Sequence, residues 1–382
     1  MAPTSLRSFS GSARKSLPLE APPGAAPLRD KLVPPRFSGS WLTLPECVVA
    51  SALLSLREKV QHQVQEFGSK FRLMWGMSRK LRFIPEGGSL VEVTNRTIQG
   101  RLLLRPSLQL NDILLGVLGR AQRLYPLEII GYSFLGNHYH LLLQVEDAQQ
   151  LAQFMGYFNG NLAREVARLT GWKDKVWSRR YESILVTEED AAQVERLRYL
   201  LENSCKEGLV DSPIHWPGVH CAKALITGDR VEGTWFDRKL EHNARLRGKE
   251  PEPREFASPE EVILSQLPCW RHLSPEAYRS RIAELVREIE ETAATVRQET
   301  GREPLGEEGV RAQDPETRPR KIKKSPAPFV HAATKAARKA MWEAYGWFVA
   351  AFRDAAEKLK AGDLAAAFPA GSFPPGLPFV AA

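Results

Sequence analysis

The chain has 382 residues, of which 43% are hydrophobic and 9% aromatic, enough apolar material to bury a sizeable core. Its 53 lysines and arginines outnumber its 45 aspartates and glutamates, so the formal net charge is +8 at pH 7. This balance excludes a chain dominated by an acidic tail and is compatible with a polyanionic partner such as nucleic acid. No uninterrupted apolar run approaches the roughly 20 residues of a membrane-spanning helix, so we expect a globular protein without a membrane partner.

Residues 1–79 precede the first predicted strand and divide into two parts. Residues 1–40 are rich in Ser, Pro, Ala and Arg without hydrophobic periodicity, which predicts a mobile arm. This arm lacks the apolar core of a secretory signal. Apolar residues recur at helical spacing over residues 45–75, which predicts a helix in an N-terminal extension covering residues 41–79.

The cysteines are few and widely separated. They are Cys47, Cys205, Cys221 and Cys269. Such spacing in a long chain is typical of a reducing compartment and not of a disulfide framework. We therefore expect free thiols and a cytoplasmic location.

The hydrophobic period changes repeatedly between residues 80 and 225. Alternating or continuous apolar runs predict strands over 89–95, 127–134, 138–145 and 181–186, and helical spacing predicts helices over 108–124, 148–170 and 188–204. The second and third strands are separated by three residues and form a predicted hairpin. This β-α-β-β-α-β-α order is typical of an α+β fold with a ferredoxin-like antiparallel sheet.

Strand signals are absent from the remainder of the chain. Ser-Pro pairs at Ser258 and Ser274 are typical of helix starts, so residues 226–300 are predicted to be a helical annex. Residues 301–330 are polar, end in a basic run and predict an exposed linker. Residues 331–382 are predicted to hold a helix over 332–360 and a Pro/Gly-rich tail. The annex and the last helix together form a C-terminal helical extension.

Two histidines in the third strand carry the clearest chemical signal. Alternate side chains of a strand share one face, so His138 and His140 project together with Cα atoms about 7 Å apart, while Tyr139 points the other way. Two imidazoles on one rigid face can bind one cation. The alternative is a pair of core histidines, each of which would require a buried hydrogen-bond partner.

The segment from Asn137, Asn-His-Tyr-His-Leu-Leu-Leu, resembles the histidine–hydrophobe–histidine motif of the HUH endonuclease superfamily. The asparagine makes it similar to the single-tyrosine insertion-sequence transposases, and in particular to the REP-associated tyrosine transposases. Leu135 and Gly136 stand where that family has Met-Pro. The resemblance covers residues 80–225 and implies the HUH nuclease fold, which is ferredoxin-like.

A second stretch, residues 198–210, resembles the family's Y-I-x-x-N-P-V-R-A-G-L-V motif, with Ser204 in place of proline. Tyr199 and Asn203 stand at i and i+4 and share one face of a helix. The resemblance implies that Tyr199 is the nucleophile and that Asn203 joins His138 and His140 around a divalent cation, Mg²⁺ or Mn²⁺. Tyr181 is the rival nucleophile, because the stretch before it is also similar to the family.

The resemblance implies an endonuclease of transposase type that cleaves and rejoins single-stranded DNA at hairpin repeats through a 5′-phosphotyrosine intermediate. Four arginines flank the predicted strands and are candidate DNA phosphate contacts: Arg96, Arg101, Arg179 and Arg180. The alternatives are an HUH replication-initiator or relaxase-like nickase, and a domesticated single-stranded nucleic-acid-binding protein without catalysis. Within the family both monomers and homodimers occur, so either assembly is expected.

Overall fold

The computed structural model describes residues 80–250, 252–319 and 327–376, and the structural statements below concern these residues. The expectations of a mobile arm over 1–40, of a helical extension over 41–79 and of a basic run over 320–324 lie outside this range. None of the described helices is long and apolar enough to cross a membrane. The three described cysteines are free thiols, as predicted.

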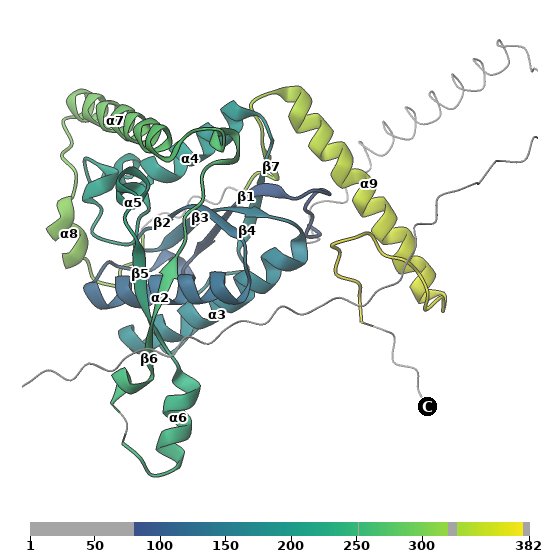
Figure 1. Ribbon diagram of the computed structural model, residues 1–382, viewed down its shortest axis with the longest axis horizontal. Coiled ribbons are helices and arrows are strands. Elements are labelled where there is room, and N and C mark those ends of the chain that lie inside the picture. Colours follow the sequence, from purple (N-terminus) through teal and green to yellow (C-terminus); the bar gives the residue numbers. More distant parts are fainter. Residues whose placement is uncertain (1–79, 251, 320–326, 377–382) are drawn as a thin grey trace, which may run out of the picture. The chain divides into compact units, whose positions relative to one another are not determined.

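The central elements follow the order that the sequence predicts (Figure 1). They are β1 (Ser89–Arg96), η1 (Ile98–Gly100), α2 (Leu108–Leu124), β2 (Glu128–Phe134), β3 (His138–Val145), α3 (Ala148–Thr170), β4 (Glu182–Val186) and α4 (Asp190–Lys206). Local signals set the helix ends. The side chains of Ser107 and Asp147 accept backbone hydrogen bonds at the starts of α2 and α3, and Gly171 ends α3 in the left-handed conformation.

Five strands form one sheet in the order β2-β3-β1-β4-β7. β1 is antiparallel to both β3 and β4, and β2 is antiparallel to β3. The short strand β7 (Val330–His331) adds to β4 in parallel. The first four strands and the helices α2 and α3 therefore have the ferredoxin-like arrangement, which confirms the predicted α+β fold.

The two faces of the sheet have different contents. Tyr139 packs against Phe158 of α3 and Trp177, with ring centroids 5.6 and 5.4 Å apart. The neighbouring histidines of β3 lie on the other face, where His140 contacts Tyr199 of α4. Figure 1 shows α2 and α3 below the sheet and α4 above it. The helices α2 and α3 thus bury the apolar face, and the histidine face lies under α4.

The remaining elements lie C-terminal to α4. They are η2 (Pro213–His215), α5 (Ala222–Thr227), β5 (Val231–Phe236), α6 (Arg238–Leu246), η3 (Pro253–Phe256), β6 (Ala257–Val262), η4 (Pro268–Trp270), α7 (Pro275–Thr300), α8 (Gly306–Ala312) and α9 (Lys335–Lys360). The predicted cap at Ser274 is confirmed, because its side chain accepts a hydrogen bond at the start of α7. The predicted C-terminal helix is α9.

The prediction of a purely helical annex over 226–300 is wrong. β5 and β6 form an antiparallel hairpin, and residues 258–261, predicted as a helix start, lie in β6. The hairpin packs across α2, where the buried carboxylate of Glu260 is paired with Arg120 and Arg123 at 2.8 and 2.9 Å. A partner strand and a buried face outweigh the local Ser-Pro signal.

The first half of the predicted linker also packs onto the domain. The backbone amide of Gly306 donates a hydrogen bond of 3.0 Å to the carbonyl of Leu209, and α8 follows directly. Val310 of α8 is buried in one apolar cluster with Trp216. Because residues 301–312 are mostly polar, Val310 gives too weak a periodic signal to predict a helix packed on the domain.

The hairpin and α2 approach so closely that a glycine is required between them. A Cβ atom at Gly116 of α2 would overlap the backbone of Thr234 in β5. We expect Gly116→Ala to lower the free energy of unfolding by about 1–3 kcal/mol, because the hairpin must shift away from the helix. Gly156→Ala in α3 is the matched control: it meets no neighbour and should stabilise by up to about 1 kcal/mol. Urea unfolding measures both, and equal effects would contradict the close crossing.

Candidate active site

β3 places His138 and His140 side by side, as predicted. Their ring centroids are 5.1 Å apart, and the rings meet edge to face. His140 is buried, and His138 is partly exposed at the strand end. On the adjacent strand, Arg96 stands opposite His138 in register. Burial lowers the pKa of His138 well below its ordinary value, and the positive charges of His140 and Arg96 act in the same direction.

Each imidazole has a partner on its Nδ1 atom. The Nδ1 of His138 lies 2.6 Å from Oδ1 of Asn137, and the Nδ1 of His140 lies 2.6 Å from Oε1 of Glu92. The amide nitrogen of Asn137 donates to the Gly100 carbonyl at 3.1 Å, which fixes the amide orientation. Both partners can only accept, so each Nδ1 donates its proton. In the neutral rings both Nε2 atoms therefore carry a lone pair that can bind a cation.

Glu92 lies at the centre of β1 and is fully buried. Its second oxygen, Oε2, accepts a hydrogen bond from Arg196 of α4. Burial alone would raise the pKa of this carboxyl. The hydrogen bond and charge of His140, and the charge of Arg196, outweigh burial and hold the pKa below its ordinary value. Glu92 is therefore ionised and links the sheet to the helix.

Tyr199 lies on the histidine face, with its ring centroid 5.7 Å from that of His140. Two cations flank the ring: the guanidinium carbon of Arg196 is 4.5 Å and the ammonium of Lys206 is 4.9 Å from its centroid. Burial raises the pKa of Tyr199, and the Glu92 carboxylate raises it further, whereas the two cations lower it. Burial prevails, so the phenol is protonated at neutral pH.

Asn203 is buried one helical turn after Tyr199. Its side-chain nitrogen has no hydrogen-bond partner among the described residues. Within the same residues, no three His, Cys, Asp or Glu side chains gather as a metal site. A cation site here would consist of two imidazoles and an amide oxygen. The donor types fit a divalent cation, with Mn²⁺ favoured over Mg²⁺ because Mg²⁺ prefers an all-oxygen shell.

The rival tyrosine lies on the opposite face of the sheet. Glu182 pairs with Thr94, which itself pairs with His140, so these three residues share a face. Side chains alternate along a strand, and Tyr181 therefore points away from the histidines. It is buried, its hydroxyl has no partner among the described residues, and Arg82 stacks 5.5 Å from its ring centroid.

The candidate DNA-contacting arginines fall into two groups. Arg96 is exposed, and its carbonyl accepts a hydrogen bond from Ser178, which brings the exposed Arg179 and Arg180 to the same edge as His138. Arg179 forms an exposed ion pair with Glu182 at 3.2 Å.

Arg101 is largely buried. Its guanidinium donates to the carbonyl of Glu316 at 2.8 Å and stacks 4.7 Å from the Trp172 ring centroid. These contacts hold residues 314–316 against the loop after β1. A DNA phosphate could reach the Arg101 guanidinium only if these contacts broke.

A family profile described as "Transposase IS200 like" matches residues 107–202, about a quarter of the chain. The matched segment runs from the cap of α2 into α4 and contains His138, His140 and Tyr199. Residues 107–202 are therefore similar to an IS200-like transposase. Asn203 lies one residue beyond the matched segment, and Glu92 lies before it.

Two solved structures resemble this chain. A REP-associated tyrosine transposase bound to a REP hairpin aligns with a TM-score of 0.30 and 19% identity, over 50% of this chain and 100% of that one. A putative transposase from Deinococcus radiodurans R1 aligns with a TM-score of 0.23 and 17% identity, over 32% of this chain and 95% of that one. No curated protein sequence matches the chain.

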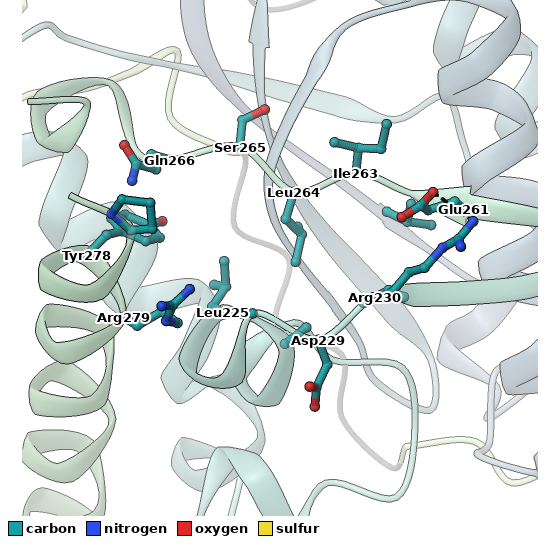
Figure 2. A pocket seen from close by; sticks show the side chains of 15 residues that line it. Leu225, Asp229, Arg230, Glu261, Ile263, Leu264, Ser265, Gln266, Tyr278 and Arg279 are labelled. Carbon is teal, nitrogen blue, oxygen red and sulfur yellow. Dashed lines mark ion pairs between the residues drawn. The ribbon is translucent and has the colours of Figure 1, made fainter. Parts of the chain in front are cut away.

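A cavity of about 330 Å³ lies outside the segment that matches the IS200-like profile, between α5, α7 and the β5–β6 hairpin. Figure 2 shows Tyr278 and Arg279 on one side and Arg230 and Glu261 on the other. Arg230 is paired with Glu261 at 3.1 Å, and Arg279 with Glu276 at 3.2 Å. None of the site residues lines this cavity, so it is separate from the histidine face.

Two residues of the site, Glu92 and Arg196, were not singled out from the sequence. The signal for Glu92 was present: it is the one acidic residue of the β-prone run Ser-Leu-Val-Glu-Val-Thr-Asn, at a position that alternates with buried valines. A carboxylate in a central strand requires a buried partner. Arg196 has the composition of an ordinary exposed helix residue, and only its pairing with Glu92 distinguishes it.

The environment of Tyr199 predicts how its phenol titrates. In the metal-free protein we expect the difference spectrum between wild type and Tyr199→Phe to show tyrosinate absorbance only above pH 10.0, the ordinary value, because burial and Glu92 disfavour the phenolate. Absorbance at 295 nm measured against pH checks this. A transition below that pH would mean that Arg196 and Lys206 outweigh burial.

Proposed function

We propose that the protein cleaves and rejoins single-stranded DNA at hairpin-forming repeats, with Tyr199 as the nucleophile and a 5′-phosphotyrosine intermediate. The observation that carries the proposal is the meeting of three rings on one face of the sheet. Two are imidazoles whose Nδ1 atoms are hydrogen-bonded, which leaves Nε2 as the ligand atom, and the third is the Tyr199 ring, 5.7 Å from His140. This meeting lies within the segment that matches the transposase family. Single-stranded hairpins are the substrate class that the resemblance implies.

In this proposal His138, His140 and Asn203 hold one divalent cation. The place of Asn203 on α4 one turn after Tyr199 and the fixed tautomers of the histidines support that role. Such a cation would neutralise a non-bridging phosphate oxygen and so stabilise the charge that develops during attack. Mn²⁺ is the preferred probe because imidazole donors suit it better than they suit Mg²⁺.

The covalent step is a transesterification. The Tyr199 Oη atom bonds to phosphorus while the bond from phosphorus to the 3′ oxygen breaks, in line with the attack. The phenol loses one proton and the departing 3′ oxygen gains one, so the products are a 5′-phosphotyrosine and a free 3′-hydroxyl. Arg196 and Lys206 beside the ring favour the phenolate that attacks.

The reverse step needs no nucleotide cofactor. A 3′-hydroxyl that attacks the phosphotyrosine restores a phosphodiester and releases Tyr199, because the protein–DNA bond has kept the energy of the original diester. The site therefore supports strand joining as well as cleavage. Either a monomer or a homodimer is compatible with this chemistry, since one chain supplies the histidines and the tyrosine.

The exposed arginines support a path for the DNA backbone. Arg96 stands beside His138, and Arg179 and Arg180 follow at the same edge of the sheet. In this proposal the three contact phosphates on either side of the cleaved bond. Arg101 would contact a DNA phosphate only after its guanidinium is released from the carbonyl of Glu316, to which it donates in this structure.

The nucleophile is tested with hairpin oligonucleotides from the flanks of the protein's own gene, labelled at the 3′ end, in Mn²⁺. We expect a labelled covalent adduct on a denaturing gel that is absent in Tyr199→Phe and reduced about 100-fold or more in His138→Ala or His140→Ala. Tyr181→Phe is the matched control and should form the adduct normally. Loss of the adduct in Tyr181→Phe alone would identify Tyr181 as the nucleophile. Tight hairpin binding without any adduct would favour a binding protein without catalysis.

The phosphate contacts are tested by the salt dependence of hairpin binding. We expect Arg96→Gln to weaken binding and to reduce the slope of log K against log salt by about 0.7, the value for one lost contact to a single strand. Arg287→Gln on α7 is the matched control, because Arg287 is also exposed but is not on the sheet or among the candidate DNA contacts. An unchanged slope in Arg96→Gln would show that Arg96 does not contact a DNA phosphate.

A further inference from the structure

The fully buried carboxylate of Glu92 needs a physical explanation. A charged group in the centre of a sheet is costly unless it is paired and hydrogen-bonded. Glu92 meets this requirement with two partners on different elements: Oε1 lies 2.6 Å from His140 Nδ1 on β3, and Oε2 accepts from Arg196 on α4. A leucine or valine at this position would fill the core without that cost. The pairing therefore points to a role beyond packing.

We propose that Glu92 is a positioning residue of the DNA-cleavage site. One of its carboxylate oxygens orients His140 toward the cation, and the other holds α4, the helix that carries Tyr199. This inference rests on the proposed function and extends it to two residues outside the family motifs, Glu92 and Arg196. The DNA itself is not contacted by Glu92, which is fully buried.

The first half of this role concerns His140. A carboxylate that accepts from Nδ1 fixes the tautomer and the ring orientation, and leaves the Nε2 lone pair toward the cation. Asn137 does the same for His138 through a neutral amide at the same distance, 2.6 Å. The two histidines thus have parallel supports from different chemical groups.

The second half concerns α4. Arg196 stands three residues before Tyr199, one turn along the helix, and its guanidinium carbon lies 4.5 Å from the Tyr199 ring centroid. The ion pair with Glu92 ties this turn to β1. Since β1 also pairs with β3, a single carboxylate fixes the position of the nucleophile relative to the histidines. A displacement of about 1 Å between reacting groups can slow a reaction by about 100-fold.

Glu92 could instead be a direct cation ligand, but its contacts argue against that. Oε1 is occupied by His140 and Oε2 by Arg196, so ligation would break one of these bonds. Among the described residues, moreover, Glu92 and the two histidines do not form a three-ligand metal cluster.

The inference is tested with the full chain by two separate measurements. Calorimetric titration with Mn²⁺ in the absence of DNA measures the Mn²⁺ affinity, which depends on the orientation of His140. The rate of adduct formation at saturating Mn²⁺ depends on the position of α4. We expect Glu92→Ala to weaken Mn²⁺ binding about 10- to 100-fold. Glu92→Gln keeps an acceptor for His140 but loses the charge for Arg196, so it should bind Mn²⁺ nearly normally while the adduct forms about tenfold more slowly.

Arg196→Gln should reproduce the second effect alone, with normal Mn²⁺ affinity and a slow adduct. Glu260→Gln is the matched control, because Glu260 is also a buried carboxylate paired with arginines but lies on β6. It should leave both measurements unchanged. Thermal unfolding of each variant separates loss of folding from loss of positioning, and if Glu92→Ala does not fold, Glu92→Gln decides.

Two results would overturn the inference. Normal Mn²⁺ affinity and a normal adduct rate in Glu92→Gln and Arg196→Gln would make the pair purely structural. Complete loss of Mn²⁺ binding in Glu92→Gln, as in His138→Ala, would make Glu92 a ligand. If the wild type forms no adduct with any hairpin but the Mn²⁺ affinities follow the expected order, the proposed cleavage fails while the role of Glu92 toward His140 stands.

Discussion

The alternation of side chains along β3 is the constraint on which the site depends. Because neighbouring residues of a strand point to opposite faces, Tyr139 is buried against α3 while His138 and His140 face α4. A shift of the register by one residue would exchange the two sets and place both histidines in the apolar core. The core packing that stabilises the fold therefore also fixes the direction of the histidines, and Tyr139 contributes to the site by anchoring the strand.

The sequence predicted those parts of the fold that have a regular hydrophobic period. The ferredoxin-like order of strands and helices, the hairpin of the second and third strands and the cap of α7 at Ser274 all follow from local patterns. The β5–β6 hairpin did not follow, because its stability comes from packing on α2 and from the Glu260 ion pairs, which no local window contains. The same reason explains α8, which is held by Val310 in a distant cluster.

The candidate site was predictable where spacing alone brings residues together. The i, i+2 histidines on a strand and the i, i+4 pair of Tyr199 and Asn203 on a helix needed no tertiary information. Glu92 and Arg196 are 104 residues apart, and their contact exists only because α4 crosses the sheet. The burial of Arg101 likewise could not be predicted from local sequence, since its partner Glu316 lies 215 residues away. Long-range pairs thus account for what sequence patterns did not predict.

The edges of the central sheet have a consequence for how this protein can be divided. On one side β7 pairs with residues 185 and 186 of β4, and on the other side backbone groups of Val219 and Ser265 bond to β2. These segments all follow α4 in the chain. A fragment that ended at residue 210 would expose strand edges of the kind that recruit other strands and lead to aggregation. The C-terminal half therefore protects the sheet from unwanted pairing, and the transposase-like part is not an independent module that could be excised unchanged.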